Sequence, residues 1–227
     1  MDVNGQEESD PHLWIKCRHP DIRHPIQTFL YKALHGAFWI GDFWNNIPQY
    51  VHRVHCSSCN EALESLEQIL IDCDNIVIST IWNLARQTWP TSFGLWPAIH
   101  LGLILGCRSI ALPLQNDDKV IRCGPSRLLC ILISESAHLI WVLCCERTIR
   151  EVNHPTETVK SRWHNKINQR IDLDRHLTSM YNRKPVTKKL VEDTWQAILL
   201  EQLPSLEEDW ITNFEVLVGI TLTRPPT

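Results

Sequence analysis

The sequence lacks the short motifs of the common nucleotide-dependent and hydrolytic enzymes. It contains no G-x-x-x-x-G-K-[ST] loop and no G-x-G-x-x-G turn, so nothing indicates a phosphate-binding loop or a dinucleotide fold. It also lacks the G-x-S-x-G and H-E-x-x-H signatures of serine hydrolases and zinc proteases. Asp117 and Asp118 lie in a polar stretch without flanking strands, so they do not predict a two-metal polymerase or nuclease centre. We therefore expect a protein that is not an enzyme.

The sequence also lacks a secretion signal. Residues 1–11 are acidic and polar, and no apolar stretch near them resembles a signal peptide. The nine cysteines are an odd number, which favours reduced or metal-bound thiols over a disulfide framework. Both features predict an intracellular protein, either nuclear or cytoplasmic.

The longest apolar run covers residues 128–145, about one membrane thickness as a helix. Glu135 lies near its middle, where an ionised carboxylate would be costly in a bilayer. We therefore expect no membrane association and interpret the run as the central helix of a bundle. His138 lies on the same helical face as Glu135. This pair is either a catalytic acid/base pair or a buried polar pair, and buried polar pairs are the commoner case in proteins.

Apolar residues recur at helical spacing through most of the chain, which predicts a mainly α fold. The expected architecture is a helical bundle with a small Cys-rich, zinc-knuckle-like turn. Helices are predicted from Pro25 onward and over 75–89, 126–149, 156–177 and 190–200. The aromatic residues at 38, 39, 43 and 44 predict a packed core rather than a base-stacking platform. The expected divisions are a disordered acidic leader (1–11), an N-terminal helical region with the Cys-rich turn at 56–73 (12–112), a linker (113–126) and a C-terminal helical region with a basic strip (127–222).

Three cysteines form the clearest ligand pattern. Cys56 and Cys59 make a C-x-x-C turn, from which two thiolates can reach one metal ion. The apolar spacing of residues 63–70 predicts one or two helical turns that carry Cys73 back toward them. The sequence therefore predicts a metal site with zinc as its ion, although three reduced cysteines in an intracellular core would give the same pattern.

A fourth ligand is not evident in the sequence. Tetrahedral zinc sites use four ligands, and the position five residues before Cys73 is Gln68, whose amide is a poor zinc ligand. The nearest other candidates are His55 and His52, although a ligand adjacent to Cys56 has awkward geometry.

Charge is divided unevenly along the chain. Residues 146–190 hold eleven Lys or Arg against five Asp or Glu, in a chain whose net charge is −4. A basic run is usually a solvated face, but this one also suits a strip that contacts the phosphates of RNA or DNA. The candidate nucleic-acid-binding residues are Arg147, Arg150, Lys160, Arg162, Lys166, Arg170, Arg183, Lys184, Lys188 and Lys189.

The order of features resembles the zinc-binding domain that follows reverse transcriptases in non-LTR retroelements. The segments are IQTFLYKALHGAFWIGDFWNNIP, the C-x-x-C turn and ESLEQILIDC. Four further segments resemble the fungal group in which this region follows a ribonuclease H-type domain: GLWPAIHLGLILGC, SRLLCILISESAHLIWVLCCERTI, SRWHNKINQRIDLDR and NFEVLVG. The resemblance covers about residues 13–220.

This resemblance implies a non-catalytic nucleic-acid-binding module. It implies that Cys56, Cys59 and Cys73 are zinc ligands, and that Gln68 replaces the family's histidine. A polymerase or ribonuclease H domain of the parent element is an implied partner, and the chain would be a C-terminal piece or a decayed copy. Two alternatives remain: a structural or protein-interaction domain without metal or nucleic acid, and a remnant enzyme that uses Glu135, His138 or Cys145.

Overall fold

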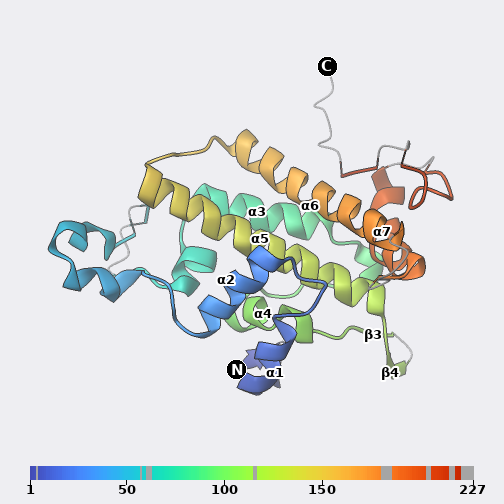
Figure 1. The fold of residues 1–227 in the computed structure, drawn as a ribbon, viewed down its shortest axis with the longest axis horizontal. Helices are drawn as coiled ribbons and strands as arrows, with labels where there is room; N and C mark the ends of the chain where they lie inside the picture. The colour runs from blue at the N-terminus through green and yellow to red at the C-terminus, as the bar shows by residue number, and fades with distance from the viewer. Residues whose placement is uncertain are drawn as a thin grey trace.

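The computed structural model is a mainly helical fold, as the sequence predicted (Figure 1). It describes residues 1–3, 5–56, 58–59, 63–114, 117–179, 186–202, 206–214 and 218–220. The α-helices are α1 (Asp10–Lys16), α2 (His24–Leu34), α3 (Ile76–Thr88), α4 (Leu101–Leu105), α5 (Cys123–Arg150), α6 (Thr156–Ser179) and α7 (Lys188–Gln202). Short helical turns are η1 (Gly41–Asn46), η2 (Pro48–Arg53), η3 (Gln68–Asp72), η4 (Thr91–Phe93) and η5 (Cys107–Ser109). The strands are β1 (Asp2–Val3), β2 (Gln6–Glu7), β3 (Pro113–Leu114) and β4 (Asp117–Ile121), and they pair as two antiparallel hairpins.

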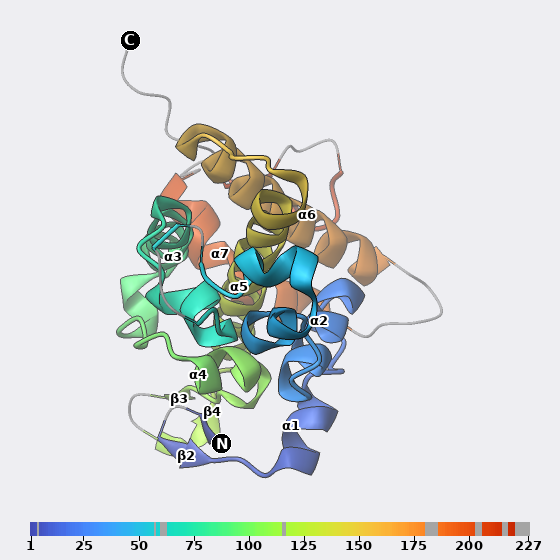
Figure 2. The same ribbon diagram turned by 90° about the vertical axis from the view of Figure 1, so that its left-hand side faces the viewer.

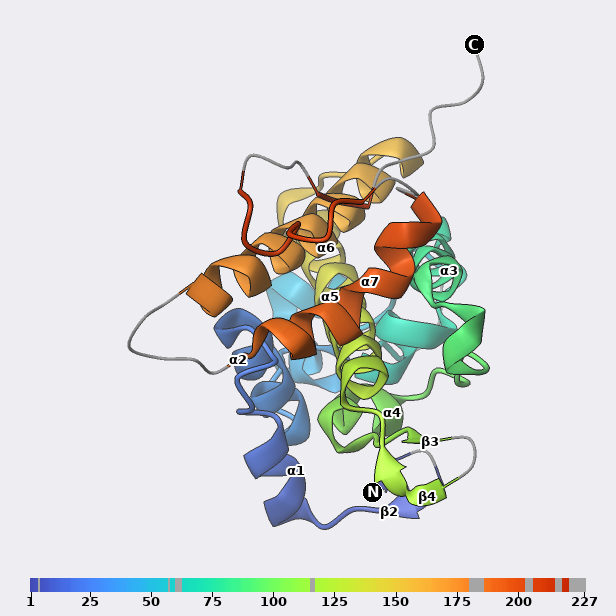
Figure 3. The same cartoon turned by 90° about the vertical axis from the view of Figure 1, so that its right-hand side faces the viewer.

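Helix α5 is the central element of the fold. Its 28 residues are apolar on almost every face, so the helix is buried along most of its length by α2, α3, α4, α6 and α7. Figure 3 shows α7 lying across it. In the described part of the chain, α5 alone is long and apolar enough to cross a membrane, and 72% of its most apolar window is buried inside the molecule. Packing against neighbouring helices thus accounts for its hydrophobicity.

The surrounding helices follow the predicted periodicity. Helix α2 begins with Pro25 in its first turn and buries Phe29 and Leu30. Helix α3 is capped by Asn75, whose side chain accepts a hydrogen bond from the Val77 backbone. Helix α6 buries most of its apolar stripe, namely Val159, Trp163, Ile167 and Ile171, whereas Leu173 is exposed.

The predicted leader and linker are not found. Residues 2–3 and 6–7 form the β1–β2 hairpin, and Val3 is buried against α4. A Cβ on Gly106 would lie 2.3 Å from Val3 Cγ2, so glycine permits this packing. Where a linker was predicted, residues 113–114 and 117–121 pair as β3 and β4, and residues 123–126 form the first turn of α5. Because α3 packs on both α5 and α6, a single core joins the two predicted regions.

A buried ionic network links the elements of this core. Arg127 on α5 donates to Asp174 on α6 at 2.6 and 2.8 Å, and to Asp21 at 2.7 Å. Trp195 on α7 donates to the same Asp174 at 2.8 Å. Burial would raise the pKa of the Asp21 carboxyl, but a hydrogen bond from His19 and the Arg127 guanidinium outweigh burial and lower it. Since each buried charge has a partner, the network ties three helices together.

Candidate metal centre and neighbouring surfaces

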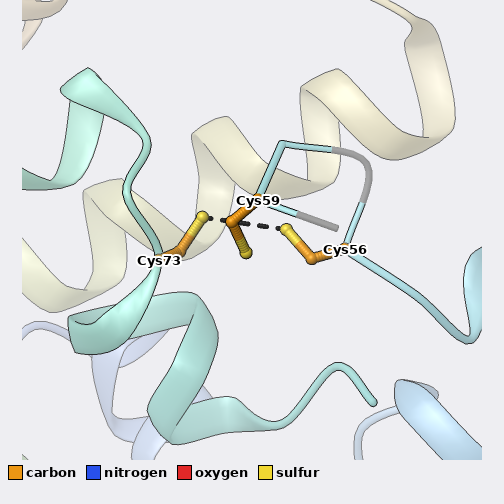
Figure 4. Close-up of side chains that lie close together, drawn as sticks. All are labelled: Cys56, Cys59 and Cys73. Atoms are coloured by element: carbon orange, nitrogen blue, oxygen red, sulfur yellow. Dashed lines mark hydrogen bonds between the residues drawn. The ribbon is translucent and has the colours of Figure 1, made fainter. Parts of the chain in front are cut away.

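The three predicted cysteines converge at one end of α3. Between α2 and η3 the chain leaves the bundle as a protruding segment that contains η1 and η2, visible on the left of Figure 1. It returns where the Glu64 backbone N–H donates to the Val54 carbonyl at 2.9 Å. Cys56 and Cys59 lie just after Val54, and Cys73 follows η3, so the side chains point toward one another from two segments (Figure 4).

The sulfur atoms form a compact group. All three lie within 4.8 Å of one another, and Cys56 Sγ lies 3.7 Å from Cys73 Sγ. Cys56 and Cys73 are buried, while Cys59 is half-buried. Cys56 and Cys73 line a cavity of about 240 Å³. Three thiols at this separation could hold a metal ion.

Gln68 occupies the fourth side of this group. Its Nε2 donates to Cys59 Sγ at 2.8 Å, and only 6% of the residue is exposed. Its Oε1 is buried, and no described residue donates a hydrogen bond to it. The predicted alternatives, His52 and His55, are not in the group. Among the described residues, the three cysteines are the only set of three or more potential metal ligands whose ligand atoms lie within 4.8 Å of one another.

The environment favours one thiolate in the group. Burial disfavours the Cys56 thiolate, but hydrogen bonds from the Ser58 and Cys59 backbone and from the Gln68 amide outweigh burial and lower the pKa of Cys56 to about 7. Burial, reinforced by the neighbouring Cys56 charge, raises the pKa of Cys73 to about 12. Between about pH 7 and 12 the close pair therefore holds one proton.

Arg147 places a positive charge beside the sulfurs. Its Nη2 lies 3.9 Å from Cys56 Sγ and 3.8 Å from Cys144 Sγ, and its Nη1 donates to Ser58 Oγ. This guanidinium is therefore engaged with the cysteine group. The sequence had assigned it to phosphate contacts.

Only some side chains of the predicted basic strip lie on the protein surface. Arg170 is 1% exposed and pairs with Asp174 one helical turn away, so assigning it to phosphate was wrong. Arg162 donates to Glu146 at 2.6 Å, which, together with His154, lowers the pKa of that carboxyl to about 2 despite partial burial. Lys160 pairs with the exposed Glu157. The other members are Arg150, Lys188 and Lys189, which are exposed, Lys166, which is half-buried, and Arg183 and Lys184, which lie outside the described residues.

The predicted acid/base groups of α5 are engaged or buried. Glu135 accepts two hydrogen bonds from the Arg23 guanidinium, one of them at 2.6 Å. Burial, with the nearby charges of Arg23 and Lys166, lowers the pKa of His138 to about 4. Burial and the nearby Glu64 raise the pKa of Cys145 to about 11, so this thiol is not activated as a nucleophile.

Sequence reasoning missed an exposed aromatic surface. Phe38 packs on Trp141 as predicted, with ring centroids 4.1 Å apart. Trp39, however, is 68% exposed, and Phe43 and Tyr50 are also exposed. The only sequence signal was the density of aromatic residues, which a packed core would share. The protruding segment faces the viewer in Figure 2.

No protein-family model matches this chain, and no curated protein or solved structure matches it either.

Proposed function

We propose that this chain is a non-catalytic nucleic-acid-binding module in which one zinc ion fixes the base of the protruding segment. The observation that carries the proposal is the convergence of the Cys56, Cys59 and Cys73 sulfurs within 4.8 Å where this segment rejoins the bundle. The retroelement resemblance of the sequence supports the same function. That resemblance would make the chain one part of a larger element, with a polymerase or ribonuclease H domain as a partner.

The donor set fits zinc. Thiolates are preferred zinc ligands, and a structural site uses four ligands. The buried Gln68 Oε1 lacks a hydrogen-bond donor among the described residues, so we assign it the fourth position. Zinc would displace the thiol protons that the three cysteines still hold, and it would crosslink the C-x-x-C turn to η3. The Arg147 guanidinium would offset the negative charge of three thiolates on one divalent ion.

The exposed cations supply the phosphate-binding surface in this proposal. Arg150 ends α5, Lys166 lies on α6, and Lys188 and Lys189 begin α7. Helix α6 is about 36 Å long at 1.5 Å per residue, and Lys166 lies near its middle. Contacts between these cations and phosphates depend on charge and make affinity fall with salt.

Charge reversal tests this surface. We expect Lys188→Glu with Lys189→Glu to weaken binding to single- and double-stranded oligonucleotides at low salt and to reduce the dependence of affinity on salt. The control is the double variant Lys16→Glu and Arg86→Glu. It changes the net charge by the same amount, but on α1 and α3, and should bind like the parent. Equal affinities for the parent and the Lys188/Lys189 variant in fluorescence anisotropy would refute the role of this surface.

One observation favours the alternative of a structural or protein-interaction domain. Arg147, Arg162 and Arg170 are all engaged inside the protein, which reduces the basic surface. A parent chain that binds no oligonucleotide even at low salt would select this alternative.

A further inference from the structure

A second cavity lies between the protruding segment and the end of α5. Its volume is about 390 Å³, within the range of ligand-binding pockets. Four aromatic side chains line it: Phe38, Trp39, Trp44 and Trp141. Thr148 and Ile149 close it along α5. The cavity is therefore built for a flat, apolar-faced group.

One buried polar atom of the cavity wall has no hydrogen-bond partner among the described residues. The Arg53 Nε is fully buried and lacks an acceptor in the described part of the chain. The Glu64 side chain also lines the cavity and is only 7% exposed. Because buried polar groups are normally paired, the Arg53 Nε indicates a ligand that presents an acceptor, and the Glu64 carboxyl can accept from donors of the same ligand.

The aromatic wall continues onto the surface of the protruding segment. The rings of Trp39 and Phe43 stack in parallel, with centroids 5.2 Å apart. Trp39 is 68% exposed, so its other face is open to solvent. Trp44 packs edge-on against both Phe43 and Tyr50, and the Arg53 guanidinium lies 4.5 Å from the Tyr50 ring centroid. These rings form a series of aromatic contacts that reaches the cavity at Trp39 and Trp44.

We propose that this cavity and its adjoining rings bind an unpaired nucleobase of a single-stranded nucleic acid. A nucleobase combines flat faces that stack on aromatic rings with an edge of hydrogen-bond donors and acceptors. The Glu64 carboxyl can accept from an exocyclic amino group, while Lys32 and Arg53 on the cavity wall provide positive charge for phosphate. Arg150 directly follows the lining residue Ile149 and joins this site to the basic surface. The inference rests on the proposed nucleic-acid-binding function.

Two substitutions test the two halves of the site. Trp39→Ala removes an exposed stacking face and should weaken binding of short single-stranded oligonucleotides roughly tenfold while leaving duplex binding unchanged. Trp14→Ala removes a half-exposed tryptophan on α1, outside the cavity, and should bind like the parent. Glu64→Gln should abolish a preference for oligocytidine over oligouridine, because of the two only cytosine carries an amino group.

The outcomes separate this inference from the proposed function. If the parent binds oligonucleotides in a salt-dependent way but Trp39→Ala binds like the parent, this site is refuted and the basic surface stands. If the parent binds no nucleic acid, the proposed function fails as well. Mononucleotides that bind as tightly as the oligonucleotide would refute a strand as the ligand. A parent dimer that Trp39→Ala dissociates, with oligonucleotide affinity unchanged, would identify the rings as a contact between copies.

Discussion

At the scale of single residues, Gln68 decides whether the cysteine group is complete. The side chain is buried and reaches Cys59 Sγ through Nε2, yet its Oε1 has no donor among the described residues. An oxygen ligand in place of imidazole should weaken a zinc site without abolishing it. The sequence placed Gln68 at this position but could not show that its amide would lie beside the sulfurs.

Substitution of Gln68 tests its role as the fourth ligand. We expect Gln68→His to tighten zinc binding and Gln68→Ala to weaken it by at least about tenfold. Competition with a chromophoric chelator measures both affinities, and cobalt(II) spectra report the change of ligand. His55→Ala is the control. An effect of His55→Ala with none from Gln68→Ala would contradict the assignment.

His138 gives stability a defined pH dependence. Its pKa falls to about 4 in the fold because burial disfavours the charged ring, against about 6.5 when unfolded. The folded state thus favours the neutral ring. The stability linked to this neutral ring is fully present above about pH 6.5 and is lost as pH falls toward 4. Chemical denaturation of the parent and of His138→Gln between these pH values measures the effect. The free energy of unfolding should fall less for the variant than for the parent as the pH is lowered. Parallel pH profiles for the two proteins would contradict this.

At the scale of elements, the protruding segment depends on a glycine. Gly41 begins η1 with φ +53°, and a Cβ there would lie 2.4 Å from the Glu64 carbonyl oxygen. This close approach holds η1 against the strip of chain that carries Glu64. Since Glu64 lines the aromatic cavity, Gly41 positions both sides of that site.

A pair of glycine substitutions separates clash from backbone strain. Gly36 also has a left-handed φ, +58°, but a Cβ added there would meet no atom within 4 Å. Gly36→Ala should therefore lower the free energy of unfolding only through backbone strain, by about 1 to 2 kcal/mol. Gly41→Ala should cost distinctly more and should shift the fluorescence of the neighbouring tryptophans. Equal losses in chemical denaturation would show that the close approach does not matter.

Periodicity predicted the helices well because their apolar stripes face α5. It could not reveal that the predicted leader is packed, because Val3 is held by a two-stranded hairpin and by contact with Gly106, which offers no side chain. Arg170 was predicted as part of the basic strip, and only packing shows that it is buried and pairs with Asp174. The exposed position of Trp39 was equally hidden, since a tryptophan-rich segment also suits a core.

At the scale of the whole molecule, one apolar core and one ionic network hold the helices. Arg127 lies where α5, α6 and α7 meet and contacts both Asp21 and Asp174. Removing the guanidinium would leave two buried carboxylates without their main partner. The network therefore fixes how the helices pack rather than simply adding stability.

Arg127→Met should be strongly destabilising, by about 3 to 5 kcal/mol, because two buried carboxylates lose their partner. Lys160→Met is the control, since its partner Glu157 is exposed and such pairs contribute about 1 kcal/mol or less. The free energy of unfolding in urea measures both. A similar small loss for the two variants would contradict a structural role for the network.

The metal content of protein purified under reducing conditions bears most directly on the central proposal. We expect one zinc per chain in the parent, measured by elemental analysis with native mass spectrometry. Cys59→Ser should lose the ion, whereas Cys123→Ser should retain it, because Cys123 is exposed and outside the group. Parent protein without zinc, or equal zinc in all three proteins, would contradict a metal centre at Cys56, Cys59 and Cys73.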